Sequence, residues 1–176
     1  ATLLKPGTTT LIGPQYALLR PEFTAFRAHS LARRSEPKLM HLLITMGGVD
    51  KDNATGQVLE ALKECPLPQD SRITVVMGPH APWLDKVREQ AANMPRPTEV
   101  LIGVSNMAQL MVESDLAIGA AGSTSWERCC LGLPTVMMVL ALNQREAAQH
   151  LLNSGAVLLL ESDGSVKENL LSLMRE

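Results

Sequence analysis

The sequence predicts one α/β domain, with a parallel β-sheet of about six strands and helices on both faces, preceded by a short leading segment. Apolar runs of strand length alternate along the chain with helical patterns, which is typical of βαβ units. The 176 residues include two Trp, one Tyr and two Phe, so the core must be aliphatic, as in buried parallel sheets. Most of the predicted strands are followed by a glycine, which lets the backbone approach a ligand closely.

The predicted strands cover residues 39–46, 73–77, 98–102, 115–118, 134–140 and 156–160. The predicted helices cover residues 54–64, 82–92, 107–113, 124–131, 144–153 and 166–174, and Pro82 suits the first position of its helix because no N–H is needed there. In the leading segment, residues 22–34 show helical periodicity, and Ser35, Glu36 and Pro37 break it. We therefore expect an interdomain segment with a docked helix over residues 1–38 and a ligand-binding domain over residues 39–176.

The charge balance and the hydropathy pattern argue against two classes of partner. A net charge of −2 gives no reason to expect nucleic acid or an acidic membrane surface, and we interpret Arg27, Arg33 and Arg34 as a solvated face or linker. No apolar run reaches the roughly 18 residues that a membrane span needs. We therefore expect neither nucleic-acid binding nor a membrane span.

The cysteines and acidic residues give no sign of a cofactor. Cys65, Cys129 and Cys130 are odd in number and lack the spacing of a metal site. Free thiols fit a reducing compartment, so we expect a cytoplasmic protein. Asp50 and Asp52 lie close in sequence, but nothing completes a ligand set around them. The sequence therefore predicts no metal and no other cofactor.

The strongest functional signal follows the strand predicted over residues 115–118. A turn of small residues leads through Gly122 and Ser123 into a helix that begins at Thr124. Free N–H groups at a helix start, with hydroxyl groups beside them, favour an anion such as a diphosphate. Thr124 and Glu127 also have the spacing of a capping box, and the spacing alone does not decide between the two interpretations.

A second loop of interest follows the first predicted strand, at the edge of the sheet where ligands bind in such folds. Gly47 and Gly48 permit a ligand to approach the backbone closely. Asp50 or Asn53 can cap the helix that follows. The sequence favours capping over ligand contact at this loop.

Two more loops carry polar side chains. Asn143 and Gln144 follow the strand predicted over residues 134–140 and offer donors and acceptors for sugar hydroxyls, although a simple surface turn is the favoured explanation on sequence alone. His80 is a conceivable general base, but no Ser/His/Asp set accompanies it. The catalytic residues therefore stay unassigned, and the sequence predicts a binding surface.

Several motifs carry a family resemblance over nearly the whole chain: Gly13-Pro-Gln-Tyr16, Arg20-Pro-Glu-Phe23, Thr45-Met-Gly47-Gly48-Val-Asp50, Asn106-Met107, Asp115 through Glu127, Leu131-Gly-Leu-Pro134 and Asn143-Gln144. With them the chain resembles the carboxyl-terminal domain of GT-B nucleotide-sugar enzymes, which include the MurG-type N-acetylglucosaminyltransferases. The nearer resemblance is to the PseG-type UDP-sugar hydrolases. These enzymes remove UDP from UDP-2,4-diacetamido-2,4,6-trideoxy-altropyranose in pseudaminic acid synthesis.

The resemblance implies a Rossmann-like domain that binds a UDP-sugar, and it implies roles for single residues. Gly122, Ser123 and Thr124 are similar to the family's diphosphate-binding helix start. Glu127 is similar to the carboxylate that accepts hydrogen bonds from the ribose hydroxyls, and the backbone near residues 104–107, which ends at Met107, is similar to the uracil-recognition loop.

The remaining implied roles concern the sugar and the cleft. Asn143 and Gln144 are similar to groups that face the sugar, and Gly47 and Gly48 are similar to the floor of the cleft. The resemblance also implies an amino-terminal catalytic domain with a Gly-rich, His-containing loop, which nothing in this sequence matches.

We therefore expect the UDP-sugar-binding half of a nucleotide-sugar hydrolase in pseudaminic-acid-type (nonulosonate) surface polysaccharide biosynthesis. Its amino-terminal catalytic domain would be a partner, with Tyr16 and Arg20 in the crossing between the two domains. The alternatives are the carboxyl-terminal half of a GT-B glycosyltransferase and a non-catalytic nucleotide-sugar-binding module.

Overall fold

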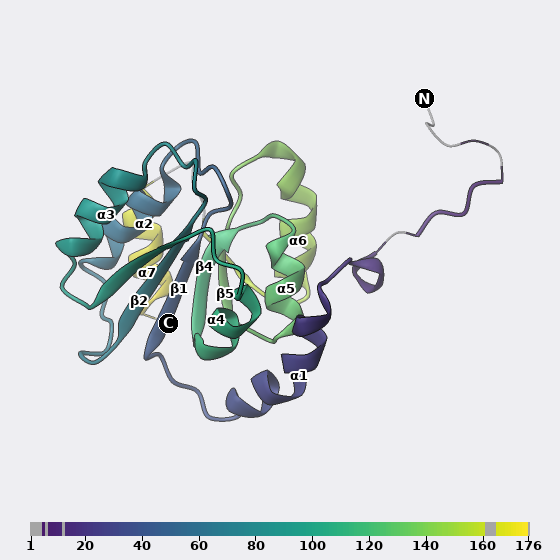
Figure 1. Cartoon of the computed structure of the whole chain (residues 1–176), viewed down its shortest axis with the longest axis horizontal. Helices are drawn as coiled ribbons and strands as arrows, with labels where there is room; N and C mark the ends of the chain where they lie inside the picture. The colour runs from purple at the N-terminus through teal and green to yellow at the C-terminus, as the bar shows by residue number, and fades with distance from the viewer. Residues whose placement is uncertain (1–4, 6, 12, 161–164, 176) are drawn as a thin grey trace.

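A computed structural model describes residues 5, 7–11, 13–160 and 165–175. It confirms the predicted fold class: six parallel strands form one sheet in the order β3-β2-β1-β4-β5-β6, with helices on both faces (Figure 1). The strands are β1 (His41–Thr45), β2 (Arg72–Met77), β3 (Thr98–Ile102), β4 (Leu116–Ala120), β5 (Thr135–Met138) and β6 (Leu158–Leu160). The helices are η1 (Pro14–Tyr16), α1 (Pro21–Arg33), α2 (Ala54–Leu62), α3 (Leu84–Ala92), α4 (Met107–Glu113), α5 (Thr124–Cys130), η2 (Leu142–Gln144), α6 (Arg145–Asn153) and α7 (Val166–Leu173).

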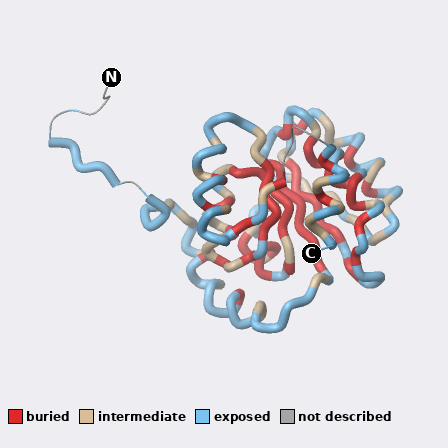
Figure 2. The backbone as a smooth tube through the Cα atoms, turned by 180° about the vertical axis from the view of Figure 1, so that it is seen from behind, coloured by how far each residue is buried: buried red, intermediate tan, exposed pale blue. Residues whose placement is uncertain are grey.

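The four central strands β1, β2, β4 and β5 are buried on both faces, which explains why their sequences show apolar runs and no alternation (Figure 2). Leu42 and Ile44 of β1 belong to the core that α2, α3 and α7 cover. Leu43, between them, belongs to the core on the opposite face, with residues of α1 and α4. Met137 of β5 packs with residues of α6 in a third cluster. The sheet is thus a rigid support between two helical layers.

The start of α3 differs from the prediction. The helix begins at Leu84, so placing Pro82 at its first position was wrong. The indole N–H of Trp83 donates a hydrogen bond to the carbonyl oxygen of Lys51 over 2.8 Å, which ties the segment before α3 to the loop after β1. This contact between two loops outweighs the local preference of proline for the first helical turn.

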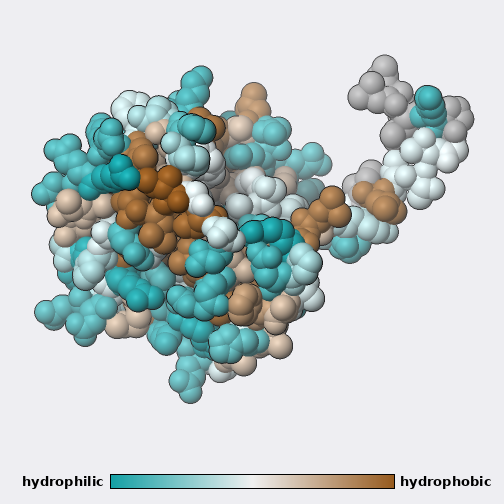
Figure 3. Space-filling model, viewed as in Figure 1, coloured by the Kyte–Doolittle hydropathy of each residue, from teal (hydrophilic) through white to brown (hydrophobic). Residues whose placement is uncertain are grey.

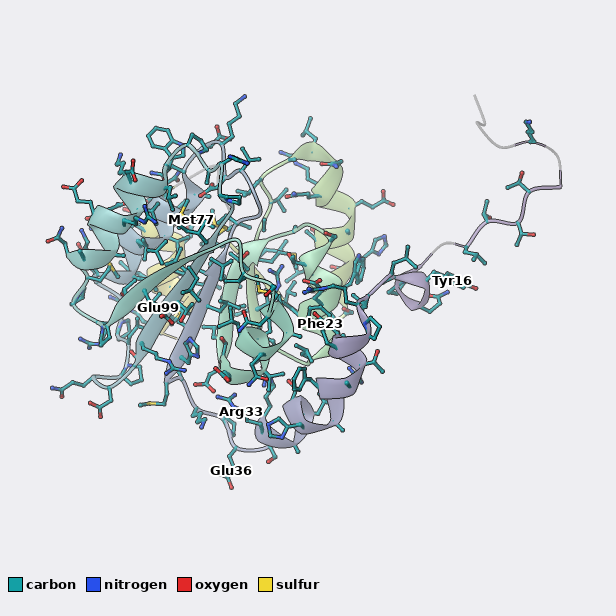
Figure 4. All side chains as sticks on the ribbon, viewed as in Figure 1. Tyr16, Phe23, Arg33, Glu36, Met77 and Glu99 are labelled. Atoms are coloured by element: carbon teal, nitrogen blue, oxygen red, sulfur yellow. The ribbon has the colours of Figure 1, made fainter. Side chains whose placement is uncertain are left out.

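Helix α1 docks on α4 and α5. Its Phe23 is fully buried and points into the body of the molecule (Figure 4), and the Ser30 hydroxyl donates to the carbonyl oxygen of Leu131 over 2.7 Å. Arg27 is exposed, as expected of a solvated face, but Arg33 and Arg34 are half-buried, so that interpretation was wrong for these two. All three donate to carbonyl oxygens around the ends of α4 and α5, because the carbonyl groups at a helix end attract cations.

Asp115 fastens α1 to the amino-terminal edge of the sheet. Its carboxylate accepts hydrogen bonds from the N–H groups of Met40 and His41, at 2.8 and 2.9 Å, and pairs with Arg33 at 2.5 Å. Burial alone would raise the pKa of Asp115, but these three hydrogen bonds outweigh burial and hold the pKa below its usual value. His41 is buried there, with Nε2 2.8 Å from the Thr74 hydroxyl.

Candidate functional site

The strand order places a crevice at the carboxyl ends of β1 and β4. From β1 the chain proceeds to β2 and β3 on one side, and then returns to β4 on the other side. Ligands of open α/β sheets bind where the strand order reverses in this way. The loops after β1 and β4, at the upper edge of the sheet in Figure 1, are therefore the first candidates.

The loop after β1 caps its own helix. The Asp50 carboxylate accepts hydrogen bonds from the N–H groups of Ala54 (2.8 Å) and Thr55 (2.9 Å), and the Asn53 side chain accepts one from Gly56 (3.2 Å). The prediction that Asp50 or Asn53 caps α2 is confirmed for both. Because a carboxylate already fills this helix start, it has no free N–H groups to offer an anion.

Gly47 and Gly48 lie exposed beside that cap. Gly47 has φ of 91°, a conformation that favours glycine. Gly48 lies against Gly78 of the loop after β2, so closely that a Cβ on Gly78 would approach the Gly48 carbonyl oxygen to 1.9 Å. The two loops after β1 and β2 therefore pack backbone to backbone at the carboxyl edge of the sheet. His80 lies exposed in the turn that follows.

The loop after β4 leaves its N–H groups unpaired. Within the described part of the chain, the N–H groups of Gly122, Ser123 and Thr124 make no hydrogen bond, and Ser123 caps α5 with no side-chain bond. A Cβ built on Gly122 would meet no atom within 4 Å, so the space above the turn is open. Three successive free N–H groups facing open space suit a phosphate.

The capping box that the spacing of Thr124 and Glu127 allows is not formed. Thr124 is already the first helical residue, which makes Glu127 the fourth and moves it one position past the one that a capping box needs. The Glu127 carboxylate makes no hydrogen bond or ion pair to any described residue. It is half-buried, and burial raises its pKa against the opposing charges of Arg20 and Arg128. An acceptor in this state is available to a ligand.

A pocket of about 230 Å³ joins the α5 turn to the loop after β5. Gly122 and Ser123 line it together with Asn143 and Gln144, so the structure brings these predicted residues together. The Gln144 side-chain oxygen accepts a hydrogen bond from the N–H of Leu140 over 2.9 Å. Gln144 therefore presents its NH₂ group to the pocket as a donor, while Asn143 at the rim is exposed.

Arg20 connects the loop after β3 to the site. Met107 begins α4 and is partly buried against the α1 and α4 core. Arg20, which precedes α1, donates to the carbonyl oxygen of Ser105 over 3.2 Å and pairs with Glu22 at 2.9 Å. The Arg20 charge also acts on Glu127. The leading segment thus connects the loop before Met107 to the neighbourhood of Glu127.

Sequence reasoning missed Arg128. Its side chain is 1% exposed and donates to the carbonyl oxygen of Ala120 over 2.7 Å, directly beneath the turn of free N–H groups. One signal was available: Arg128 lies three residues before Leu131, a core residue, so a charge sits on the buried face of the helix. Among the described residues, no group of three His, Cys, Asp or Glu side chains could hold a metal, and no helix could cross a membrane.

Residues 41–176 match the glycosyltransferase family 28 C-terminal domain. The chain belongs to this family. The family 28 domain here is 33% identical over 141 residues to an uncharacterized protein of Methanocaldococcus jannaschii, covering 79% of this chain and 29% of that protein. It is 29% identical over 146 residues to the spore coat polysaccharide biosynthesis protein SpsG of Bacillus subtilis, covering 83% of this chain and 42% of SpsG. The chain therefore spans less than half the length of these curated relatives.

Solved structures agree on the fold of the family 28 domain. Acinetobacter baumannii MurG superposes with a TM-score of 0.69 at 23% identity, over 82% of this chain and 44% of the MurG chain. Anabaena HepE, solved in complex with UDP-glucose, superposes with a TM-score of 0.60 at 16% identity, over 91% of this chain and 43% of the HepE chain. These likenesses show the Rossmann-like fold of a GT-B carboxyl-terminal half.

Proposed function

We propose that this chain is the UDP-sugar-binding half of a two-domain enzyme of polysaccharide biosynthesis. The observation that carries the proposal is the contrast between two helix starts at the crevice. The start of α2 is filled by Asp50, whereas the N–H groups of Gly122, Ser123 and Thr124 are unpaired within the described residues. A diphosphate supplies the acceptors that this turn lacks.

The protein groups beside this turn can be assigned in turn to the uracil, ribose, diphosphate and sugar of a nucleotide sugar. The loop before Met107, tied to Arg20, is assigned to the uracil, and the free carboxylate of Glu127 is assigned to the ribose hydroxyls. The Gly122 turn is assigned to the diphosphate. Asn143 and Gln144, across the same pocket, are assigned to the sugar. Gly47 and Gly48 are assigned to the floor beneath them.

The relatives support this substrate class. SpsG is named for spore coat polysaccharide biosynthesis, and the HepE structure holds UDP-glucose. The first name concerns a polysaccharide, and the second structure holds a nucleotide sugar. A nucleotide sugar is also the kind of ligand that the Gly122 turn and Glu127 suit. UDP recognition in this chain is therefore the simplest extension of its family membership.

The finer assignment is a hydrolase of the pseudaminic-acid pathway type, in which water attacks the anomeric carbon and UDP leaves with its charge stabilised by the Gly122 turn. A glycosyltransferase, in which a second sugar or lipid hydroxyl attacks, is the alternative. The motif resemblance around Asn143, Gln144 and the segment from Tyr16 to Phe23 favours the hydrolase. A non-catalytic nucleotide-sugar-binding module is the third reading.

The catalytic base belongs to an amino-terminal partner domain in this proposal, and residues 1–38 form the crossing to it. Residues 1–4, 6 and 12 of that segment lie outside the described residues. The described residues ahead of α1 project from the body and carry exposed apolar side chains (Figure 3): Leu18 is 101% exposed and Leu11 66% exposed. Tyr16 is 46% exposed and lines a groove together with Trp126 of α5 and His150 of α6. A second domain would cover these side chains.

Backbone NMR of the ¹⁵N-labelled chain titrated with UDP tests the site. The largest shifts are expected at the N–H groups of Gly122, Ser123 and Thr124. The N–H groups of Ala54 and Thr55, which Asp50 holds, serve as the internal control and should move little. Shifts concentrated at α2, or no shift at millimolar UDP, would contradict the proposal.

Measuring the release of UDP from UDP-sugars tests whether the catalytic base lies in the amino-terminal partner domain. The chain alone should release no UDP from UDP-sugars, because His80, the conceivable base, is exposed in its turn and lacks a Ser/His/Asp set in the sequence. Release of UDP by the isolated chain that disappears in His80→Asn would make His80 the base and would overturn the proposed partition. Release into water by the two-domain protein, with no acceptor present, would favour the hydrolase over the transferase.

A further inference from the structure

The Arg128 guanidinium is buried at the point where β1 and β4 end. A Cβ on Gly119 of β4 would approach Arg128 Nη1 to 2.3 Å and the Thr45 carbonyl oxygen of β1 to 2.9 Å. The absence of a side chain at Gly119 is therefore what leaves room for the guanidinium. A long side chain from α5 leans toward the helix start, which explains how Arg128 reaches back beneath the turn at Gly122.

The charge of Arg128 has no anionic partner among the described residues. Nη2 donates to the Ala120 carbonyl oxygen over 2.7 Å and to the Ser125 hydroxyl over 3.3 Å, while Nε and Nη1 are buried without a hydrogen-bond partner. Burial lowers the pKa of Arg128 to about 10, so the side chain stays charged at neutral pH. A buried charge without a partner is costly, and folding alone gives no reason to keep it.

The surroundings show where a compensating anion would lie. Ser125, which accepts from Arg128, lines the same pocket as Gly122 and Ser123. The Ala120 carbonyl oxygen, at the end of β4 just before the turn, also accepts a hydrogen bond from Arg128. Arg128 thus acts on the pocket in two ways, through its charge and through its bond to the strand that leads into the turn.

We propose that Arg128 is a positioning residue whose buried charge makes this site select a diphosphate over a monophosphate. The inference rests on the proposed nucleotide-sugar function and deepens it. Arg128 does not touch the ligand, because it is 1% exposed, but its field extends through a region of low dielectric to the turn. The electrostatic attraction to Arg128 therefore strengthens the binding of a diphosphate more than that of a monophosphate.

Calorimetry with UDP, UMP and inorganic pyrophosphate tests the inference on three variants. Arg128→Met removes the charge and keeps much of the length, Arg128→Lys keeps the charge, and Arg88→Met removes one exposed arginine of α3 as the matched control for net charge. We expect Arg128→Met to lose at least tenfold in affinity for UDP and pyrophosphate and much less for UMP. Arg128→Lys should keep the preference for UDP over UMP, and Arg88→Met should match the native chain.

Thermal unfolding without ligand separates this role from a purely structural one. Because Arg128→Met removes a buried unpaired charge, its unfolding midpoint should not fall, while the rise in midpoint on adding UDP should shrink. A folded Arg128→Met that still prefers UDP over UMP as the native chain does would overturn the inference. So would a folded Arg128→Lys that has lost the preference.

A measurement on the native chain covers the case in which Arg128→Met does not fold. The Nε–H resonance of Arg128 should shift with pyrophosphate and UDP and much less with UMP, and an unmoved resonance at saturating UDP would overturn the inference. Failure of the inference and failure of the proposed function remain distinguishable. If the native chain binds UDP and Arg128→Met keeps the native preference for UDP over UMP, Arg128 has no role. If the native chain binds pyrophosphate but not UDP, the nucleotide assignment fails instead.

Discussion

The Asp50 carboxylate accepts a hydrogen bond from the N–H of Ala54 over 2.8 Å, and this bond closes one of the two helix starts that face the crevice. The other start, at Ser123, has no such side-chain cap. A single acidic residue after β1, and its absence after β4, therefore separates the capped helix start from the one to which we assign the diphosphate. This difference leads directly to the first prediction.

Asp50→Ala should destabilise the fold and leave UDP affinity unchanged. The variant loses two hydrogen bonds to Ala54 and Thr55, and a lost charged cap costs about 1 to 3 kcal/mol. Chemical denaturation measures the loss. Asp52→Ala is the matched control, because Asp52 is exposed two residues away and only its backbone carbonyl group is hydrogen-bonded. A stable Asp50→Ala with weakened UDP binding would mean that Asp50 contacts the ligand.

Gly122→Ala should fold normally and bind UDP roughly tenfold more weakly. A Cβ there meets no protein atom within 4 Å, so the added methyl occupies only the space proposed for the phosphate. Gly78→Ala makes the opposite comparison: its Cβ would approach the Gly48 carbonyl oxygen to 1.9 Å, so stability should fall. Differential scanning calorimetry measures the stability of both variants, and titration with UDP measures their affinity. Unchanged UDP affinity in Gly122→Ala would place the phosphate elsewhere.

Glu127→Gln should weaken UDP binding by about tenfold or more, because a hydrogen bond to a charged group contributes roughly 1.5 to 3 kcal/mol. The deoxyribose analogue dUDP is the control. It should bind the native chain less tightly than UDP, and the gap should narrow in the variant. A variant with native UDP affinity that still prefers UDP to dUDP would show that Glu127 does not read the ribose.

The same variant has a pH signature. Burial raises the pKa of Glu127, opposed by Arg20 and Arg128, so its ionised form is disfavoured in the folded chain. Without ligand, Glu127→Gln should therefore be at least as stable as the native chain at pH 7. Any gain should shrink as the pH falls through the raised pKa and vanish below the ordinary value of about 4.3, where Glu127 is protonated in both the folded and the unfolded chain. A variant less stable at pH 7 would contradict this account.

Asp115→Asn should show the opposite pH dependence. The hydrogen bonds from Met40, His41 and Arg33 outweigh burial and lower the pKa of Asp115, so its ionised form stabilises the fold above the ordinary carboxyl pKa of about 3.9. The native chain should lose this stability as the pH falls through the lowered pKa. Asp115→Asn should be less stable at pH 7, and the difference should shrink in acid. Urea unfolding at a series of pH values measures it.

Local patterns were enough to predict the sheet and most helices. The apolar run of β3 and the helical pattern of α4 gave both elements to the residue, because their ends coincide with local signals. The start of α3 was missed, because Trp83 bonds to Lys51, 32 residues away. Arg33 and Arg34 were misinterpreted for the same reason: their partners are carbonyl oxygens about 80 residues along the chain.

The candidate site was predictable as a set of loops but not in its electrostatics. Glycines and polar pairs after strands marked the Gly122 turn and Asn143 with Gln144, and the structure gathers them around one pocket. Sequence spacing could not exclude the capping box. The box requires Thr124 to be the N-cap, and the structure starts the helix one residue earlier, with Ser123 as the N-cap. Arg128 was missed because its burial depends on the space that Gly119 leaves between two strands.

The central claim is that the turn at Gly122, Ser123 and Thr124 holds a diphosphate, and calorimetric titration of the native chain with UDP and UMP tests it most directly. Both ligands carry the same base and ribose, so a difference in affinity reports on the second phosphate. The three unpaired N–H groups and the open space above Gly122 predict that UDP binds at least tenfold more tightly. Equal affinities for UDP and UMP would contradict the diphosphate assignment.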